Sequence, residues 1–467
     1  MSKPSIDSND IPPELKQFLQ RDTYSLLIRG KYGSGKTALS LTILRSLKAT
    51  DNFFYISTRT SPTQLFDYYP WLSKFVKKQD SLNQYVNSEE HPVHPCFEDA
   101  RLDEPESLFE RITNQLMDIK SPIIIIDSWD AIASLMDKES RINNERVLQT
   151  WRERAGARII FITEGVQDSG LDYIADGVVE LSNDISDNTA IRKLTITKLR
   201  GVPIEKTTYL FSLKGGVFKC FSKYLPLEYN NLIHNLANRL GTQIVFRGSN
   251  ISMQSGFTDL DRALGGGYRE GSIVIVKADK ILSHILPLLF LERTIKEFMY
   301  KDGEIVVSGS SILYSLNQII SVPINRTAGK SSRFLHFKFE SQKLKRNERN
   351  LQNNAACTEL TSLLDLQKFK KKNKTLNLMG LDTLQNTMTK EGMNLYDVSR
   401  LLKINFTLSF IIVNSDDDIQ RYKSICDIYL KFVVISGTLI LKCVLPSLGA
   451  FGVKLSDSQR LQLLRSL

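Results

Sequence analysis

Short apolar runs alternate with amphipathic stretches along the first 200 residues. Strands are predicted at residues 25–28, 53–58, 123–126, 157–163, 176–181 and 192–201, where apolar and β-branched residues cluster. The stretch after the first strand carries apolar residues at 39, 41, 43, 44 and 47, a spacing typical of a helix with one buried face. Strands that alternate with helices indicate an α/β fold with a mostly parallel, doubly wound sheet. Such sheets bind ligands at the carboxyl ends of their strands.

The bulk composition predicts a cytoplasmic globular protein with more than one domain. The chain has 467 residues, 42% of them hydrophobic and 24% charged, which is long for a single core. It contains no run of 18 apolar residues that would predict a membrane span, and its first 15 residues lack the apolar core of a signal peptide. Five scattered cysteines without a C-x-x-C pair fit a reducing compartment.

Positive charge is concentrated in the second half. Residues 1–250 hold 31 Lys and Arg against 31 Asp and Glu, whereas residues 251–467 hold 30 against 20. Much of the excess lies in a predicted basic insertion at 342–374, which contains "QKLKRNERN" and "KFKKKNK". Contact with nucleic acid, contact with an acidic protein and simple solvation all remain open for this segment. Only Phe369 interleaves the second run, which disfavours a dedicated single-strand site.

The strongest motif is "GKYGSGKT", which follows the first strand and opens the first long helix. It has the form G-x-x-x-x-G-K-[ST] in the strand–loop–helix context of a phosphate-binding P-loop. The glycines let backbone N–H groups converge on phosphate oxygens, the lysine reaches the β- and γ-phosphates, and the threonine hydroxyl ligates Mg²⁺. The motif therefore predicts ATP and Mg²⁺ as cofactors. Its residues are Gly30, Lys31, Tyr32, Gly33, Ser34, Gly35, Lys36 and Thr37.

A second Mg²⁺-binding group is predicted at the end of "IIIID". Four isoleucines form a strand buried on both faces, and Asp127 follows them directly. A carboxylate at this place would hold a Mg²⁺-bound water, so Thr37 and Asp127 are the candidate metal residues. Asp130 is expected to cap the helix that follows.

The order of these motifs resembles the RecA superfamily and, within it, the KaiC/RadA-like branch of P-loop ATPases. The resemblance covers about residues 20–220 and rests on the P-loop, "IIIIDS", "FITEG", "YIADGVVEL" and "RKLTITKLRG". It implies a RecA-like fold that self-associates as a dimer or ring. It also implies that Lys198 and Arg200 reach the γ-phosphate bound by a neighbouring subunit. The alternative for these two residues is the solvated end of an edge strand.

A narrower resemblance, best over residues 11–165, is to the archaeal gas-vesicle regulators of the GvpD family, which are themselves KaiC-like. It rests on "IPPELKQFLQRDTYSLLIRGKYGSGKT", "YISTRTSP", "YYPWL" and "IIIIDSWDAI". The shared part is the nucleotide domain and not a vesicle component. The resemblance therefore implies an ATP-binding regulator and does not imply a role in gas vesicles.

One departure from the family pattern bears on hydrolysis. KaiC-like proteins carry a Glu pair after the second strand, where one carboxylate activates water, whereas this chain has Arg59 and Thr60 there. An arginine is not a general base at neutral pH. We therefore predict ATP binding with slow or absent hydrolysis, and we predict that Arg59 stabilises the γ-phosphate. Glu164, after a later strand, is either a substitute base or an ordinary loop residue.

The second half resembles a KaiC-like domain that has lost its phosphate site. The segment "SGFTDLDRALGGGYREGSIVIV" (255–276) is similar to the entry sequence of such a domain, but its strand runs into "KADKILSH", which has no glycine and no Lys-Thr. The segment "TLNLMGLDTL" (375–384) takes the place of the aspartate-bearing strand, with Asp382 near its end. We predict two tandem RecA-like domains, at 1–235 and 236–467, the second a pseudo-ATPase domain without a P-loop.

Three functions are consistent with this sequence. The first is a regulatory protein whose bound ATP sets its affinity for a partner and whose hydrolysis is weak or absent. The second is an active DNA-dependent ATPase of recombination or repair. The third is an interaction scaffold that binds nucleotide for stability. DNA-stimulated turnover separates the second from the others, and a nucleotide-dependent change in partner binding separates the first from the third.

Overall fold

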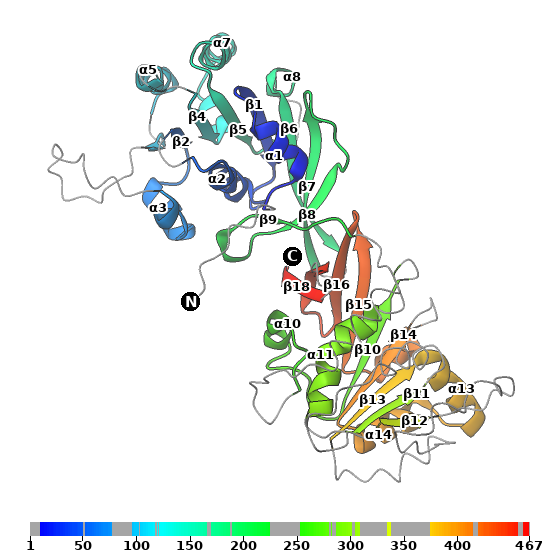
Figure 1. The fold of residues 1–467 in the computed structure, drawn as a ribbon. Helices are drawn as coiled ribbons and strands as arrows, with labels where there is room; N and C mark the ends of the chain where they lie inside the picture. Colours follow the sequence, from blue (N-terminus) through cyan, green and yellow to red (C-terminus); the bar gives the residue numbers. More distant parts are fainter. Residues whose placement is uncertain are drawn as a thin grey trace. The chain divides into compact units, whose positions relative to one another are not determined.

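The computed structural model describes residues 10–49, 52–76, 96–101, 103–116, 119, 121–165, 170–186, 189–224, 253–279, 282, 286–300, 304–308, 334–337, 374–413, 419–455 and 461–466. The chain divides into two compact units, the first formed by Met1–Ser186 and Ala190–Ser222 and the second chiefly by Lys223–Ser466 (Figure 1). The domain boundary predicted between residues 235 and 236 lies outside the described residues. So do residues 342–373 of the predicted basic insertion.

In the first unit, the described strands form one nine-stranded sheet in the order β3-β2-β4-β5-β1-β6-β7-β8-β9. The strands are β1 (Tyr24–Gly30), β2 (Phe53–Ser57), β3 (Phe97–Asp99), β4 (Ile123–Asp127), β5 (Arg158–Thr163), β6 (Gly177–Ser186), β7 (Thr189–Leu199), β8 (Thr208–Ser212) and β9 (Lys219–Cys220). The helices are α1 (Pro13–Leu19), α2 (Lys36–Leu47), α3 (Pro62–Tyr68), α4 (Leu72–Phe75), α5 (Pro105–Leu116), α6 (Trp129–Ala133), α7 (Lys138–Arg154), α8 (Leu171–Ile174) and the 3₁₀ turn η1 (Lys214–Gly216).

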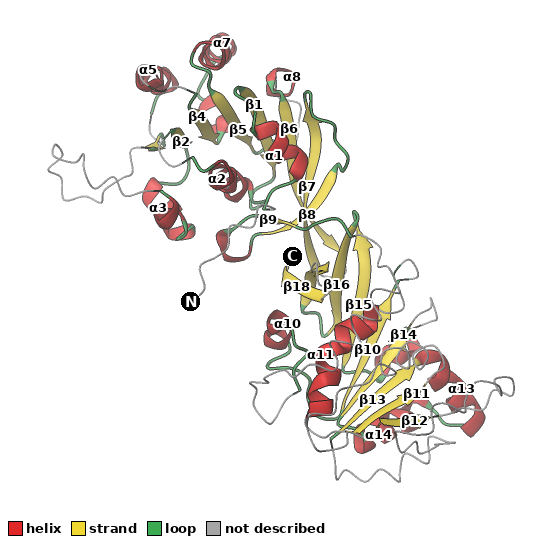
Figure 2. Ribbon diagram, viewed as in Figure 1, coloured by secondary structure: helices red, strands yellow, loops and turns green. Residues whose placement is uncertain are grey.

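The pairing of these strands confirms a mostly parallel sheet. Neighbours from β3 through β6 run parallel, and β8 pairs antiparallel with β7 and with β9. Alternate residues of the central strands pack against α1 and α2 on one face and against α5, α6 and α7 on the other. Figure 2 shows α2 on one side of these strands and α5 and α7 on the other. Apolar side chains are required on both faces, which explains the uninterrupted isoleucine run of β4.

The second unit repeats the arrangement, with the described strands in the order β12-β11-β13-β14-β10-β15-β16-β17-β18. The strands are β10 (Ser272–Ala278), β11 (Glu304–Ser308), β12 (Phe334–Phe337), β13 (Thr375–Gly380), β14 (Leu408–Val413), β15 (Ile428–Ile435), β16 (Thr438–Leu445), β17 (Gly449–Leu455) and β18 (Leu461–Ser466). The helices are α10 (Thr258–Ala263), α11 (Leu286–Tyr300), α13 (Leu381–Glu391), α14 (Leu395–Asn405) and the 3₁₀ turn η4 (Arg421–Ser424).

The two sheets have the same topology when β10 is matched with β1 and the other strands follow in order. An equivalent hydrogen bond supports the match. The carboxylate of Asp176 accepts from the backbone N–H of Ser25 at 3.1 Å, and that of Asp427 accepts from the N–H of Ile273 at 2.8 Å. Each aspartate precedes the strand that pairs with the central strand of its sheet. The chain is therefore a duplicated RecA-like α/β fold, as the sequence predicted.

Candidate nucleotide-binding site

The phosphate loop leaves the carboxyl end of β1 and enters α2. A Cβ atom on Gly30 would lie 2.4 Å from the carbonyl oxygen of Leu181, so a side chain there would force the loop away from β6. Gly35, the residue before α2, has φ 101°, a left-handed conformation in which other residues are strained. Glycine is thus required at both ends of the loop, which keeps its backbone open to a phosphate.

Lys36 lies inside this loop. Its ammonium donates to the carbonyl oxygens of Gly30 at 2.7 Å and Lys31 at 3.0 Å, and the side chain is buried. Burial lowers the pKa of the Lys36 ammonium, and the carboxylates of Glu164 and Asp127 oppose that shift. The acceptors of this ammonium are neutral carbonyl oxygens, whereas a phosphate would present negatively charged oxygens to it.

Thr37 and Asp127 meet at the carboxyl edge of the sheet. The Thr37 hydroxyl donates to Oδ2 of Asp127 at 2.6 Å, and the Tyr55 hydroxyl donates to the same oxygen at 2.6 Å. A hydroxyl and a carboxylate at this distance form an oxygen donor set of the kind that Mg²⁺ takes. These residues therefore fit an Mg²⁺ ion, with Thr37 as a direct ligand and Asp127 as the holder of a bound water.

Tyr55 was not predicted from the sequence as part of the site. Its ring is fully buried in β2, beside β4, and burial raises the pKa of its hydroxyl well above the usual value, so that the group stays a proton donor to Asp127. The only signal for it was a hydroxyl-bearing residue within an otherwise apolar strand. Because the contact depends on which strands become neighbours, the sequence alone did not reveal it.

Arg59 and Glu164 also converge near the loop. Arg59 follows β2 and Glu164 follows β5, and their side chains form an ion pair with a 2.7 Å distance between Nη2 and Oε2. The Arg59 guanidinium also lies over the ring of Tyr32, 5.5 Å from its centroid. Asp130 does not cap a helix as expected, because it lies within α6 and its carboxylate accepts from the backbone N–H of Glu164.

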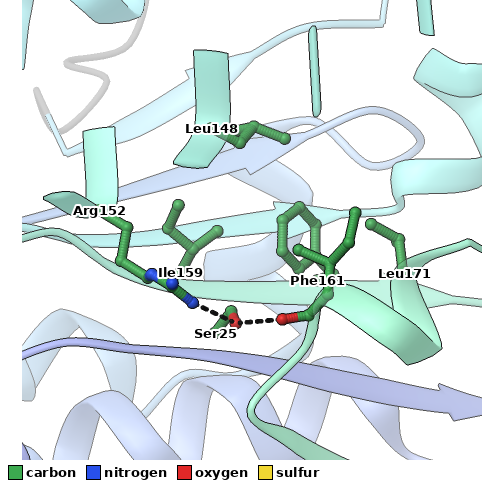
Figure 3. Close-up of a pocket in the computed structure, with 7 residues that line it drawn as sticks. Ser25, Leu148, Arg152, Ile159, Phe161 and Leu171 are labelled. Carbon is green, nitrogen blue, oxygen red and sulfur yellow. Dashed lines mark hydrogen bonds between the residues drawn. The ribbon is translucent and has the colours of Figure 1, made fainter. Parts of the chain in front are cut away.

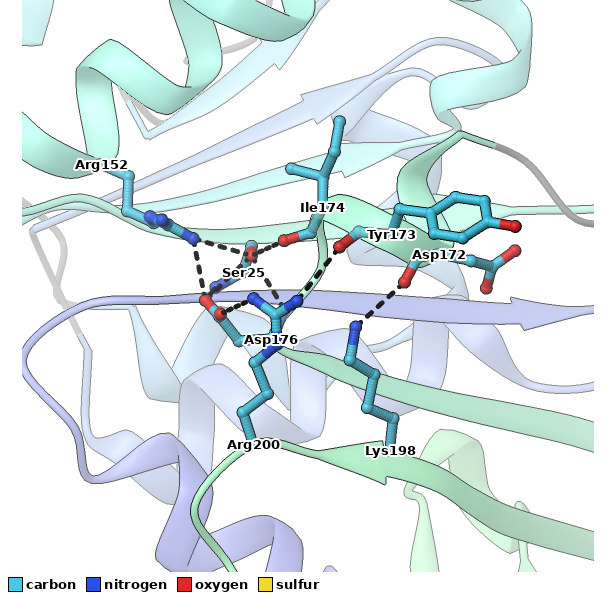
Figure 4. A network of polar contacts seen from close by, with 8 residues as sticks. All are labelled: Ser25, Arg152, Asp172, Tyr173, Ile174, Asp176, Lys198 and Arg200. Atoms are coloured by element: carbon cyan, nitrogen blue, oxygen red, sulfur yellow. Dashed lines mark hydrogen bonds and ion pairs between the residues drawn. The ribbon is translucent and has the colours of Figure 1, made fainter.

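Lys198 and Arg200 lie at the opposite edge of the sheet, near the start of β1, and do not reach the phosphate loop of their own unit. Lys198 donates to the carbonyl oxygen of Asp172 at 3.1 Å, and Arg200 donates to the Asp176 carboxylate at 3.1 Å (Figure 4). Arg152 binds the other oxygen of that carboxylate at 2.9 Å. A role for Lys198 or Arg200 at a phosphate therefore requires a second chain.

A small cavity lies beside this network and not beside the phosphate loop. It has a volume of about 10 Å³, close to that of one water molecule, and it is lined by Ser25, Leu148, Arg152, Ile159, Phe161, Leu171 and Ile174 (Figure 3). The Ser25 hydroxyl is within 3.4 Å of both the Arg152 guanidinium and the Ile174 carbonyl oxygen. The cavity is too small for a nucleotide, so the candidate site remains the phosphate loop.

Among its described residues, the second unit has no carboxylate at the place equivalent to Asp127. Asp127 pairs with Ile162 on β5, and the residue at the equivalent register is Gly380, which pairs with Ile412 on β14. β13 ends at Gly380, and Asp382, which was expected near the end of this strand, lies in the first turn of the helix α13 that follows.

The start of the former loop is also changed. Ala278 pairs with Phe432 on β15, as Gly30 pairs with Leu181 on β6. The backbone N–H of the next residue, Asp279, donates to the carbonyl oxygen of Phe432 at 3.3 Å, and the Asp279 carboxylate lies 3.7 Å from the Lys431 ammonium. This arrangement places a negative charge where a phosphate-binding loop would begin.

The fold and the site of the first unit define a P-loop domain of the RecA superfamily. More particularly, residues 15–199 match the family model "GvpD gas vesicle protein, P-loop domain", so this part of the chain is similar to the P-loop domain of GvpD proteins. No helix in the described ranges has both the length and the apolar character needed to cross a bilayer.

Comparisons with individual proteins point to the same similarity. The chain is 30% identical over 308 residues to protein GvpD1 of Halobacterium salinarum, which covers 63% of this chain and 55% of that protein. It is 26% identical over 307 residues to protein GvpD2 of the same organism, covering 63% and 60%. It is also 26% identical over 265 residues to the circadian clock oscillator protein KaiC of Prochlorococcus marinus, covering 54% and 48%. The chain thus spans little more than half the length of these GvpD relatives.

Proposed function

We propose that this protein is a cytoplasmic regulator that binds ATP and Mg²⁺ in its first unit, hydrolyses ATP slowly or not at all, and changes its affinity for a partner with its nucleotide state. The observation that carries the proposal is the contact between the Thr37 hydroxyl and the Asp127 carboxylate, beside the Lys36 ammonium. This arrangement supports Mg-ATP binding. The similarity to GvpD and KaiC proteins supports a regulatory role.

The features of the second unit favour a regulatory protein over an ATPase that uses hydrolysis to do work. This unit keeps the RecA-like topology but has Gly380 in place of the metal carboxylate and Ala278 and Asp279 at the start of the loop. We infer that it is a pseudo-ATPase domain, which provides an interaction surface and does not hydrolyse ATP. A DNA-dependent ATPase remains the second candidate, favoured by the excess of positive charge in residues 251–467.

Hydrogen–deuterium exchange on the full chain tests whether the nucleotide acts as a signal. With Mg-ATP and Mg-ADP compared at saturation, we expect backbone amides of residues 57–61 and 163–165 to exchange differently in the two states, because these loops carry the charges beside the P-loop. A scaffold that binds nucleotide for stability would show the same protection with both. Identical exchange in the two states would contradict the regulatory proposal.

Self-association is part of the proposal, with Arg200 as the residue that meets the nucleotide of a neighbouring chain. Its side chain is 55% exposed, whereas Arg152, which binds the same Asp176 carboxylate, is 27% exposed. We expect Arg200→Ala to abolish an ATP-promoted dimer or ring in light scattering, while the matched variant Arg152→Ala retains it. A strictly monomeric wild type at saturating ATP, or equal loss of assembly in both variants, would refute this role.

A further inference from the structure

The loop between β2 and α3 holds Arg59 at a fixed place beside the P-loop. Thr58 is tied to the end of β4, because its N–H donates to the Asp127 carbonyl at 2.8 Å and its hydroxyl accepts from the Ser128 N–H at 2.8 Å. On the other side, Ser61 opens α3 with a capping box, in which its hydroxyl accepts from the Gln64 N–H. The backbone around Arg59 is thus anchored, and its long side chain is the part able to move.

Among the described residues, Glu164 is the charged partner of the Arg59 side chain, which is only partly covered. The Arg59 side chain is 47% exposed, whereas the Glu164 side chain is 14% exposed and its backbone N–H is held by Asp130. Glu164 is therefore the fixed member of the pair and Arg59 the mobile one. The Tyr32 ring, 74% exposed on the P-loop, lies under the guanidinium and links the pair to the loop that receives phosphates.

The same pair lies beside the candidate phosphate and metal residues. Thr58, the residue before Arg59, is bonded to Asp127, and the Arg59 guanidinium lies over the Tyr32 ring of the P-loop. Arg59 is therefore placed beside the loop whose lysine, in P-loop proteins, contacts the β- and γ-phosphates. A guanidinium can bind a phosphate through two parallel hydrogen bonds. A phosphate also presents more negative charge to the guanidinium than a single carboxylate does.

We propose that Arg59 is the sensor of the terminal phosphate, and that it leaves Glu164 and Tyr32 when ATP is bound but stays with them when ADP is bound. The proposal rests on the proposed function, since it assumes that the P-loop binds ATP. The exchange of partners gives the two nucleotide states different structures in the loops after β2 and β5. ATP binding releases the Glu164 carboxylate and the Tyr32 ring, and loss of the γ-phosphate restores the ion pair.

Affinities for Mg-ADP and for a Mg-bound non-hydrolysable ATP analogue test this sensor on the full chain. We expect Arg59→Ala to weaken binding of the ATP analogue by about 10- to 100-fold, the range of a charge-assisted contact, and to change ADP binding by less than about threefold. Glu164→Gln should act in the opposite direction, because it removes the competitor for the guanidinium and so tightens binding of the ATP analogue. The double variant should behave like Arg59→Ala alone.

Arg101→Ala is the matched control, because Arg101 pairs with Asp99 at 2.7 Å after β3 and is 43% exposed. It should leave both affinities unchanged. Equal weakening of ATP and ADP binding in Arg59→Ala, or no change in either, would overturn the sensor while leaving the P-loop site intact. A wild-type protein that binds neither nucleotide would overturn the proposed function and the sensor together. Thermal unfolding of each variant shows whether a loss of binding comes from a loss of folding.

Discussion

Replacing Lys36 by alanine should weaken Mg-ATP binding by about 100-fold, the largest effect we expect from any single substitution in this chain. The Lys36 ammonium is buried within the loop and bonded to the carbonyl oxygens of Gly30 and Lys31. It is the cation that a P-loop uses for the β- and γ-phosphates, and no side chain replaces it in Lys36→Ala. Isothermal titration calorimetry on the full chain measures the loss directly.

The same titration counts the sites. We expect one Mg-ATP per chain in the wild type, because the second unit has neither the lysine nor the metal carboxylate of the first. Lys277→Ala, at the end of β10, should leave affinity and stoichiometry unchanged. Wild-type affinity in Lys36→Ala would contradict the P-loop assignment. A second saturable site that vanishes in Lys277→Ala would contradict the pseudo-ATPase domain.

The parts of the site that lie close together in sequence were predictable. The P-loop is one continuous segment, and Asp127 follows a run of four isoleucines whose burial on both faces makes its strand recognisable. The fold class was predictable for the same reason, since strands and helices alternate with clear spacing. The duplication followed from the repeated order of motifs in the second half.

Contacts between separate strands were not predictable from one sequence. Tyr55 reaches Asp127 because β2 pairs with β4, and the order of strands in the sheet cannot be read from the sequence alone. The ion pair of Arg59 with Glu164 likewise joins loops from two different strands. The equivalence of Gly380 with Asp127 likewise depends on which residues pair across neighbouring strands, and one sequence does not state that register.

Slow hydrolysis is the second large effect that we expect. A general base accelerates attack by water by about 10²–10⁴-fold, and the place after β2 where the family carries carboxylates is held by Arg59 and Thr60. We therefore expect turnover below about 0.01 s⁻¹, near the scale of unassisted nucleotide hydrolysis by P-loop GTPases.

Glu164→Gln distinguishes a partner of Arg59 from a general base. We expect the residual rate of ATP hydrolysis to change by less than tenfold. The amide keeps the shape of the side chain, and the usual position of the base already lacks a carboxylate. A fall of about 100-fold or more would instead assign the role of base to Glu164. Both outcomes are read from the same single-turnover assay with radiolabelled ATP.

The most direct test of an ATP-bound switch is the turnover rate of the purified full chain with saturating Mg-ATP, measured with and without DNA at one stated salt concentration. Our account predicts tight binding, a rate below about 0.01 s⁻¹ and no acceleration by DNA. A rate of about 1 s⁻¹ or faster, which is typical of a working enzyme, would contradict it, and so would strong stimulation by DNA.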